Sequence, residues 1–160
     1  MKDFLDKLSS YNLFNYFLPG ILFVVISKEI TTYSFLQENI LTGIFLYYFI
    51  GLVISRIGSL IIEPVLKYFS FLKFADYKNF VSASQKDPKI ELLSENNNMY
   101  RTLSSLFVVL LGLKFYELIE YCWPILKNFN SYVLTIGLLI LFLFSYRKQT
   151  NYITKRININ

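Results

Sequence analysis

The sequence contains no histidine and only one cysteine, Cys122, among its 160 residues. Without histidine the chain cannot build histidine-containing zinc sites, histidine general bases or cysteine–histidine nucleophile pairs. A single cysteine excludes a disulfide within the chain, and an intermolecular disulfide through Cys122 is the alternative to a simple packing role. These absences remove several large classes of enzyme and metalloprotein.

Further signatures of catalysis are also missing. The sequence has no glycine-rich phosphate loop, no Gly-x-Ser-x-Gly turn and no recognisable pair of catalytic carboxylates. We therefore expect a protein that is not an enzyme, with no cofactor and no metal site.

Apolar residues are what the chain has in abundance. They make up 54% of the sequence, and the mean hydropathy is +0.43, which fits no ordinary soluble domain. They gather in four runs, each near the ~20 residues that a helix needs to cross a bilayer. The sequence predicts an all-α membrane protein, a single domain over residues 1–160, with four transmembrane helices at about 11–30, 40–62, 102–122 and 131–147 and a cytoplasmic helical hairpin at 64–100 between the second and third.

The first span is the one most open to another interpretation. Pro19 removes a backbone donor and predicts a kink, and the alternative to crossing is that the residues before it lie along the interface. Asp3 and Asp6 stand where a signal peptide would be basic, and no small-residue cleavage site follows Ile26. We therefore expect this span to be retained as an anchor.

Lysine and arginine are distributed unequally between the two sides of this arrangement. Of the 16, Lys28 and Lys127 fall on the outer side, Arg56 and Lys114 fall within spans, and the other 12 fall in the N-terminus, the central loop or the C-terminal tail. The positive-inside rule then favours four crossings with both termini in the cytoplasm. The net charge of +5 is explained by this rule and by attraction to membrane lipids, so nucleic acid is not an expected partner.

Small residues mark one face of the second span. At roughly 100° per residue, Gly51, Ser55, Gly58 and Ser59 share a patch, and Gly43 lies at its margin. Such seams let helix backbones approach closely in lipid. We expect these residues to pack against another helix, either of the same chain or of another copy in a homo-oligomer, with a chance arrangement as the alternative.

Charged residues mark a different face of the second span, provided that the helix continues past Pro64. Arg56, Glu63 and Lys67 then form one polar stripe. One interpretation pairs Glu63 with Lys67 at spacing four and lets Arg56 extend to the inner boundary of the membrane. The other places Arg56 in a polar crevice or at an oligomer axis, where it acts on anions or on a partner helix.

Lys114 is expected near the middle of the third span. Glu117 lies three residues further on the same face, so the two charges form either a neutralised pair buried between helices or part of a pore or proton path. Glu120 points away from this pair and is expected near the outer headgroups, where Trp123 also belongs, with Cys122 filling space beside it.

The central segment contains the candidate docking residues. Val65 to Ala83 is aromatic and basic, which predicts a helix at the inner interface, and Ser84 to Asn98 reads as a turn and a short connector. Either Ser94 or Asn96 is expected to cap the third span. The side chains expected to reach lipid or a cytosolic protein are Lys67, Lys73, Lys78 and Phe80.

Two short stretches, YNLFNYFLPG at Tyr11 to Gly20 and LSENNNMYRT at Leu93 to Thr102, resemble small bacterial membrane proteins, some of which sit in anti-phage defence clusters. The predicted architecture is also similar to the four-helix membrane subunit of the Kiwa defence system. This resemblance implies a membrane sensor or effector beside a cytosolic subunit, and it assigns no functional residue.

The leading functional hypothesis is a self-associating inner-membrane module of bacterial anti-phage defence with a cytosolic protein partner. The first alternative is an ion channel or small transporter lined by Arg56, Lys114 and Glu117. The second is a membrane protein that gives immunity to a toxin.

Overall fold

The computed structural model describes residues 10–158, and within that range the chain is helical without any strand. The basic and acidic residues of the first nine positions, used in the charge argument above, lie outside the described residues. The elements are α2 (Ser10–Asn12), η1 (Leu13–Phe17), α3 (Leu18–Ile30), α4 (Ile40–Ile57), η2 (Gly58–Ile62), α5 (Glu63–Tyr68), α6 (Tyr77–Lys86), α7 (Lys89–Cys122), η3 (Pro124–Phe129) and α8 (Asn130–Ile157).

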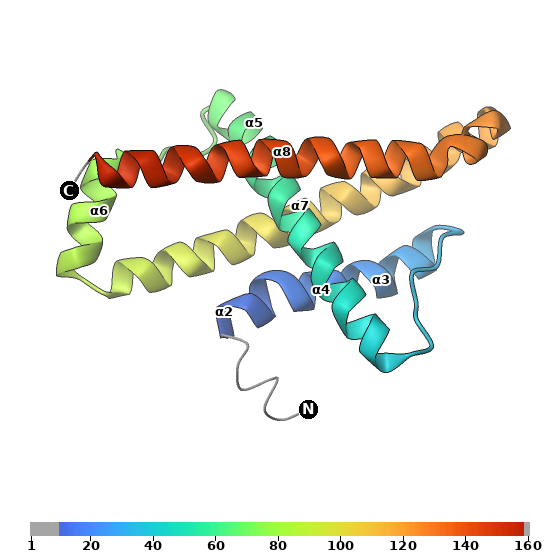
Figure 1. Ribbon diagram of the computed structural model, residues 1–160, viewed down its shortest axis with the longest axis horizontal. Helices are drawn as coiled ribbons and strands as arrows, with labels where there is room; N and C mark the ends of the chain where they lie inside the picture. The colour runs from blue at the N-terminus through green and yellow to red at the C-terminus, as the bar shows by residue number, and fades with distance from the viewer. Residues whose placement is uncertain (1–9, 159–160) are drawn as a thin grey trace.

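Four stretches of helix are long and apolar enough to cross a membrane, namely Leu13–Ile30, Ile40–Tyr68, Lys89–Cys122 and Pro124–Ile157. The prediction of an all-helical chain with four candidate membrane-spanning helices is confirmed. In Figure 1, α3 and α7 run toward the right, α8 runs back to the left, and α4 crosses them steeply. The α3–α4 and α7–α8 connections lie toward the right end of the molecule, while α6 and the end of α8 lie at the other.

The buried core lies where α3, α4 and α7 meet. Its apolar members are Phe23, Val24, Ile54, Leu106 and Leu110. α4 crosses α7 and α8 obliquely, and α8 rests against α4 outside this core (Figure 1). The expected four-helix bundle is thus a three-helix core with a fourth helix laid against it.

Both prolines within these helices follow a π-helical turn. The residue before each proline donates its backbone N–H to the carbonyl five residues back instead of four, which joins Leu18 to Leu13 and Glu63 to Gly58. The wider turn keeps the proline ring clear of the carbonyl four residues before it, so each helix continues. The kink expected at Pro19 is a π turn, and the second helix does continue through Pro64.

The segment between the second and third long helices differs from the prediction. α5 ends at Tyr68, a turn with Ser70 at φ 57° follows, and α7 begins at Lys89. The expected connector at Ser84 to Asn98 is therefore wrong, and neither Ser94 nor Asn96 caps a helix. Pro88 is pre-set for a helix start, and Asp87 Oδ1 accepts a 3.0 Å hydrogen bond from the Lys89 N–H.

α7 is longer than a span requires. Its 34 residues extend over about 51 Å, against the ~30 Å of a hydrocarbon core. About two-fifths of its length would therefore exceed the hydrocarbon core of a membrane that it crosses, and that part could contribute to a site at the membrane surface.

Candidate functional site

A network of buried polar side chains joins the three core helices. Asn15 of η1, Ser55 of α4 and Thr102 of α7 are 1%, 4% and 0% exposed. The Thr102 hydroxyl lies 2.9 Å from Asn15 Oδ1 and 3.2 Å from Ser55 Oγ, and Asn15 Nδ2 lies 3.5 Å from the same serine oxygen. The Thr102 hydroxyl also lies 2.9 Å from the carbonyl oxygen of Asn98, which can accept its hydrogen bond. Buried polar groups that satisfy one another in this way hold helices in one arrangement.

Glycines allow the backbones to approach closely enough for this network. A Cβ on Gly51 would stand 1.7 Å from the carbonyl oxygen of Tyr16, and one on Gly20 would stand 1.7 Å from the carbonyl oxygen of Tyr47. Gly58 faces α7, with 2.3 Å between its would-be Cβ and the nearest hydroxyl oxygen. The small-residue face of the second span therefore packs within one chain, against η1 and α7.

A layer of charged residues adjoins the network. Glu63 is 7% exposed and receives hydrogen bonds from Lys67 at 2.8 Å and from Arg101 Nη1 at 2.9 Å. Lys148 of α8 donates to the carbonyl oxygen of Ser59 at 2.6 Å and to its hydroxyl at 2.8 Å. Among the described residues, the Nε of Arg101 is a buried side-chain nitrogen that lacks a hydrogen-bond partner.

Most of these groups line a cavity of about 540 Å³, whose walls come from α2, η1, α4, η2, α5, α6, α7 and α8, while Lys148 lies outside it. Its charged lining consists of four cations and one carboxylate, and its remaining lining is of hydroxyl, amide and aromatic side chains and Ala75. The charged residues are Arg56, Glu63, Lys67, Arg101 and Lys155. The polar stripe expected on the second span thus faces one cavity.

Of the expected docking residues, two reach this cavity and two do not. Phe80 lines it, and Lys67 Nζ lies 4.0 Å from the centre of the Phe74 ring. Lys73 and Lys78 are exposed and are not among the residues that line it.

A second polar cluster lies at the other end of α7. Lys114 donates to Glu117 at 2.7 Å, and Glu117 also accepts a 2.6 Å hydrogen bond from the Thr32 N–H in the α3–α4 connection. The Lys114 side chain is 47% exposed, so the pair is not buried between helices. Because Glu117 contacts the α3–α4 connection, the pair lies near one end of the helices.

Glu120 is buried, which the sequence did not indicate. It is 4% exposed and accepts hydrogen bonds from the hydroxyl of Tyr33 and from Asn130 Nδ2, and Tyr116 donates to Asn130 at 2.6 Å. Loss of solvation and the hydrogen bond to Glu120 raise the pKa of Tyr33 well above its usual value, so this phenol remains a donor. Glu120 therefore fastens the α3–α4 connection to the end of α7.

The structure brings some of the predicted residues together and separates others. Arg56, Glu63 and Lys67 share the cavity, whereas Lys114 and Glu117 lie at the opposite end of α7. The sequence prediction missed the members of the network and of the charged layer on other helices, namely Asn15, Thr102, Arg101 and Lys148. In the sequence, each of these residues is a polar side chain inside or beside an apolar run, and that feature could have identified them as candidates.

No three histidine, cysteine or acidic residues in the described part of the chain are grouped so that they could hold a metal ion. Comparison of the chain with protein-family models, with curated proteins and with solved structures gives no match.

Proposed function

We propose that the chain is a non-enzymatic module of a bacterial inner membrane, which it crosses four times with both termini in the cytoplasm. The charge distribution supports this orientation. Among the described residues, the end of the molecule with the α3–α4 and α7–α8 connections has Lys28, Lys127 and the paired Lys114, whereas the end with the cavity has most of the other cations. Cytoplasmic segments are the ones rich in lysine and arginine.

The role we propose is that of a membrane sensor or effector of anti-phage defence that works with a cytosolic partner. One observation carries the sensing role: the buried network and the cavity are contiguous. Ser55 belongs to both, and Thr102 of the network follows directly after Arg101 of the cavity on α7. A molecule bound at the cavity therefore acts on the side chains that hold α3, α4 and α7 together, which is what a shift between two packings requires.

Self-association is part of the proposal and is supported by the exposed apolar side chains of α8. Ser145 is the one buried residue of this helix, and most of its apolar side chains are exposed. Helix faces of this kind contact lipid or another helix, and helix pairs in lipid form by close packing.

An ion path is the competing proposal, and a single copy of the chain does not favour it. Arg101, which lines the same cavity as Arg56, lies thirteen positions before Lys114 on α7, or about 20 Å along the helix axis. The three residues expected to line such a path would have to come together between copies.

Native mass spectrometry after gentle solubilisation, with and without the products of neighbouring genes, tests the proposal. We expect an oligomer of this chain that retains a soluble partner. Lys73→Glu together with Lys78→Glu should release that partner. Arg147→Glu, which reverses the charge of an exposed residue on α8, should not. A chain that retains no partner but conducts ions when reconstituted alone would replace this proposal with the ion path.

A further inference from the structure

We propose that the chain has a built site for one anionic phospholipid, with the phosphate in the basic cavity and an acyl chain between η2 and α8. The inference rests on the orientation proposed above, because that orientation places the cavity at the cytoplasmic leaflet. The shared chemistry is a phosphate-bearing anion, and the lipid is favoured over a soluble phosphate because the groove that receives it changes from basic to apolar along its length.

The basic part of the groove has more positive charge than the protein itself compensates. Its four cations face one carboxylate, Glu63, which is already occupied by Lys67 and Arg101. The buried Nε of Arg101 has no hydrogen-bond partner, and Arg56 and Lys155 form no ion pair within the described residues. A phosphate placed here would receive charge-assisted hydrogen bonds from several sides.

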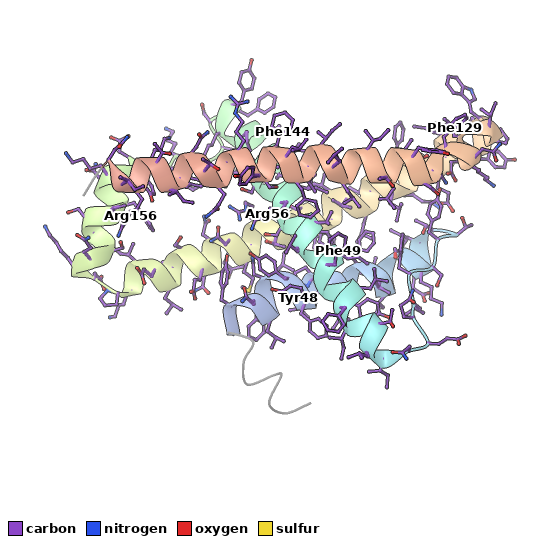
Figure 2. The ribbon with its side chains drawn as sticks, viewed as in Figure 1. Tyr48, Phe49, Arg56, Phe129, Phe144 and Arg156 are labelled. Carbon is purple, nitrogen blue, oxygen red and sulfur yellow. The ribbon has the colours of Figure 1, made fainter. Side chains whose placement is uncertain are left out.

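The apolar part is a cavity of about 390 Å³ lined by residues of η2 and α8. Its lining is almost entirely hydrocarbon and consists of Leu60, Ile61, Gly137, Ile140, Leu141 and Phe144. Its position is the place where α8 passes over α4 and η2, close to the residues labelled Arg56 and Phe144 in Figure 2.

A small cavity of about 20 Å³ lies between the two parts. It shares Arg56, Ser59 and Tyr152 with the basic cavity and Leu60 with the apolar one, and Lys148 lies in its wall. The three cavities follow one stripe of α8, at successive turns from Gly137 to Lys155. A phospholipid has the same sequence of parts, a charged phosphate followed by hydrocarbon, and lies in the same direction relative to a membrane.

Gly137 provides a substitution that separates the two parts of the ligand. A Cβ at Gly137 would meet no atom within 4 Å, so Gly137→Leu can fill the apolar cavity without forcing the helices apart. Gly112 on α7 has equally open surroundings and lines none of the three cavities, so Gly112→Leu is the matched control.

The experiment is native mass spectrometry of the full chain in detergent, with phosphatidylglycerol added, or phosphatidylcholine of the same acyl chains. We expect wild type to retain one phosphatidylglycerol per chain about tenfold more strongly than phosphatidylcholine. Arg56→Gln should weaken retention about tenfold, and Lys155→Gln should weaken it in the same direction. Arg147→Gln, which removes an exposed cation that lines none of the three cavities, should not change it.

Glycerol 3-phosphate, which has the phosphate without acyl chains, distinguishes the two sources of the anion. We expect it to compete weakly with phosphatidylglycerol, and we expect Gly137→Leu, but not Gly112→Leu, to weaken lipid retention about tenfold. Effective competition by glycerol 3-phosphate together with unchanged retention in Gly137→Leu would overturn the lipid in favour of a soluble phosphate.

Equal retention of the two lipids by wild type would overturn the anion site itself. Variants are compared only when they elute as wild type does, and the exposed Lys155 provides the test if Arg56→Gln does not fold. Because this measurement uses purified chain without partners, its failure leaves the sensor proposal, which is tested by partner retention, unaffected.

Discussion

Gly51→Ala should destabilise the protein strongly although alanine is the better helix former. The added Cβ would stand 1.7 Å from the carbonyl oxygen of Tyr16, which is a backbone atom and cannot rotate away. The helices must separate by about 1.5 Å to restore a C···O contact of ~3.3 Å. Overpacking of this kind costs up to ~3 kcal/mol, whereas the gain in helix propensity is ~1 kcal/mol. We expect a net loss of about 2 kcal/mol.

Gly112→Ala is the control for this prediction, because its Cβ would meet no atom within 4 Å. It should be neutral or stabilise the chain by up to ~1 kcal/mol, so the two variants should differ by roughly a hundredfold in unfolding equilibrium. Unfolding by sodium dodecyl sulfate in mixed micelles, followed by near-ultraviolet circular dichroism, measures the difference. Equal midpoints for Gly51→Ala and Gly112→Ala would refute the close backbone contact.

Three further predictions concern other parts of the chain. Thr102→Val keeps the shape of the side chain but removes the hydroxyl at the centre of the buried network, and it should lower the stability by ~1–3 kcal/mol in the same unfolding assay. Lys114→Met should lower the stability less than Glu117→Leu, because the Glu117 carboxylate keeps its hydrogen bond from the Thr32 N–H. The double variant should assemble, and full activity in that assembled variant would exclude both as functional residues. Reporters fused after Gln85 and after Ser34 should lie in the cytoplasm and outside, respectively, and a cytoplasmic reporter after Ser34 would remove the first crossing.

Periodicity predicted which residues of the second span share a face, but not what each face meets. Gly51 and Gly58 lie on one patch because of the helical repeat alone, and their close approach to other helices follows from their size. That Gly51 contacts η1 while Gly58 contacts α7 depends on the oblique path of α4, which no local pattern encodes. The Glu63–Lys67 pair was predictable because both partners lie on one helix at spacing four.

Patterns along one helix could not predict interactions between segments that are distant in the sequence. Glu120 is buried because Tyr33, 87 residues earlier in the chain, donates to it, and nothing near Glu120 in the sequence indicates that partner. Lys148 contacts Ser59 across 89 positions for the same reason. The start of α7 was misplaced because the apolar run was taken as the limit of the helix, whereas polar residues from Lys89 onward continue it.

The two π turns set the rotational phase of the helices that contain them. Each holds one residue more than an α turn would, so the segments before and after it are rotated about 100° relative to an uninterrupted helix. Asn15 lies inside the first of these turns, and its side chain therefore reaches Thr102 only while the extra residue is accommodated there. Pro19 and Pro64 prevent the turns from relaxing to ordinary α geometry. The direction in which the Asn15 side chain points from its helix thus depends on the ring of Pro19, four residues further along the chain.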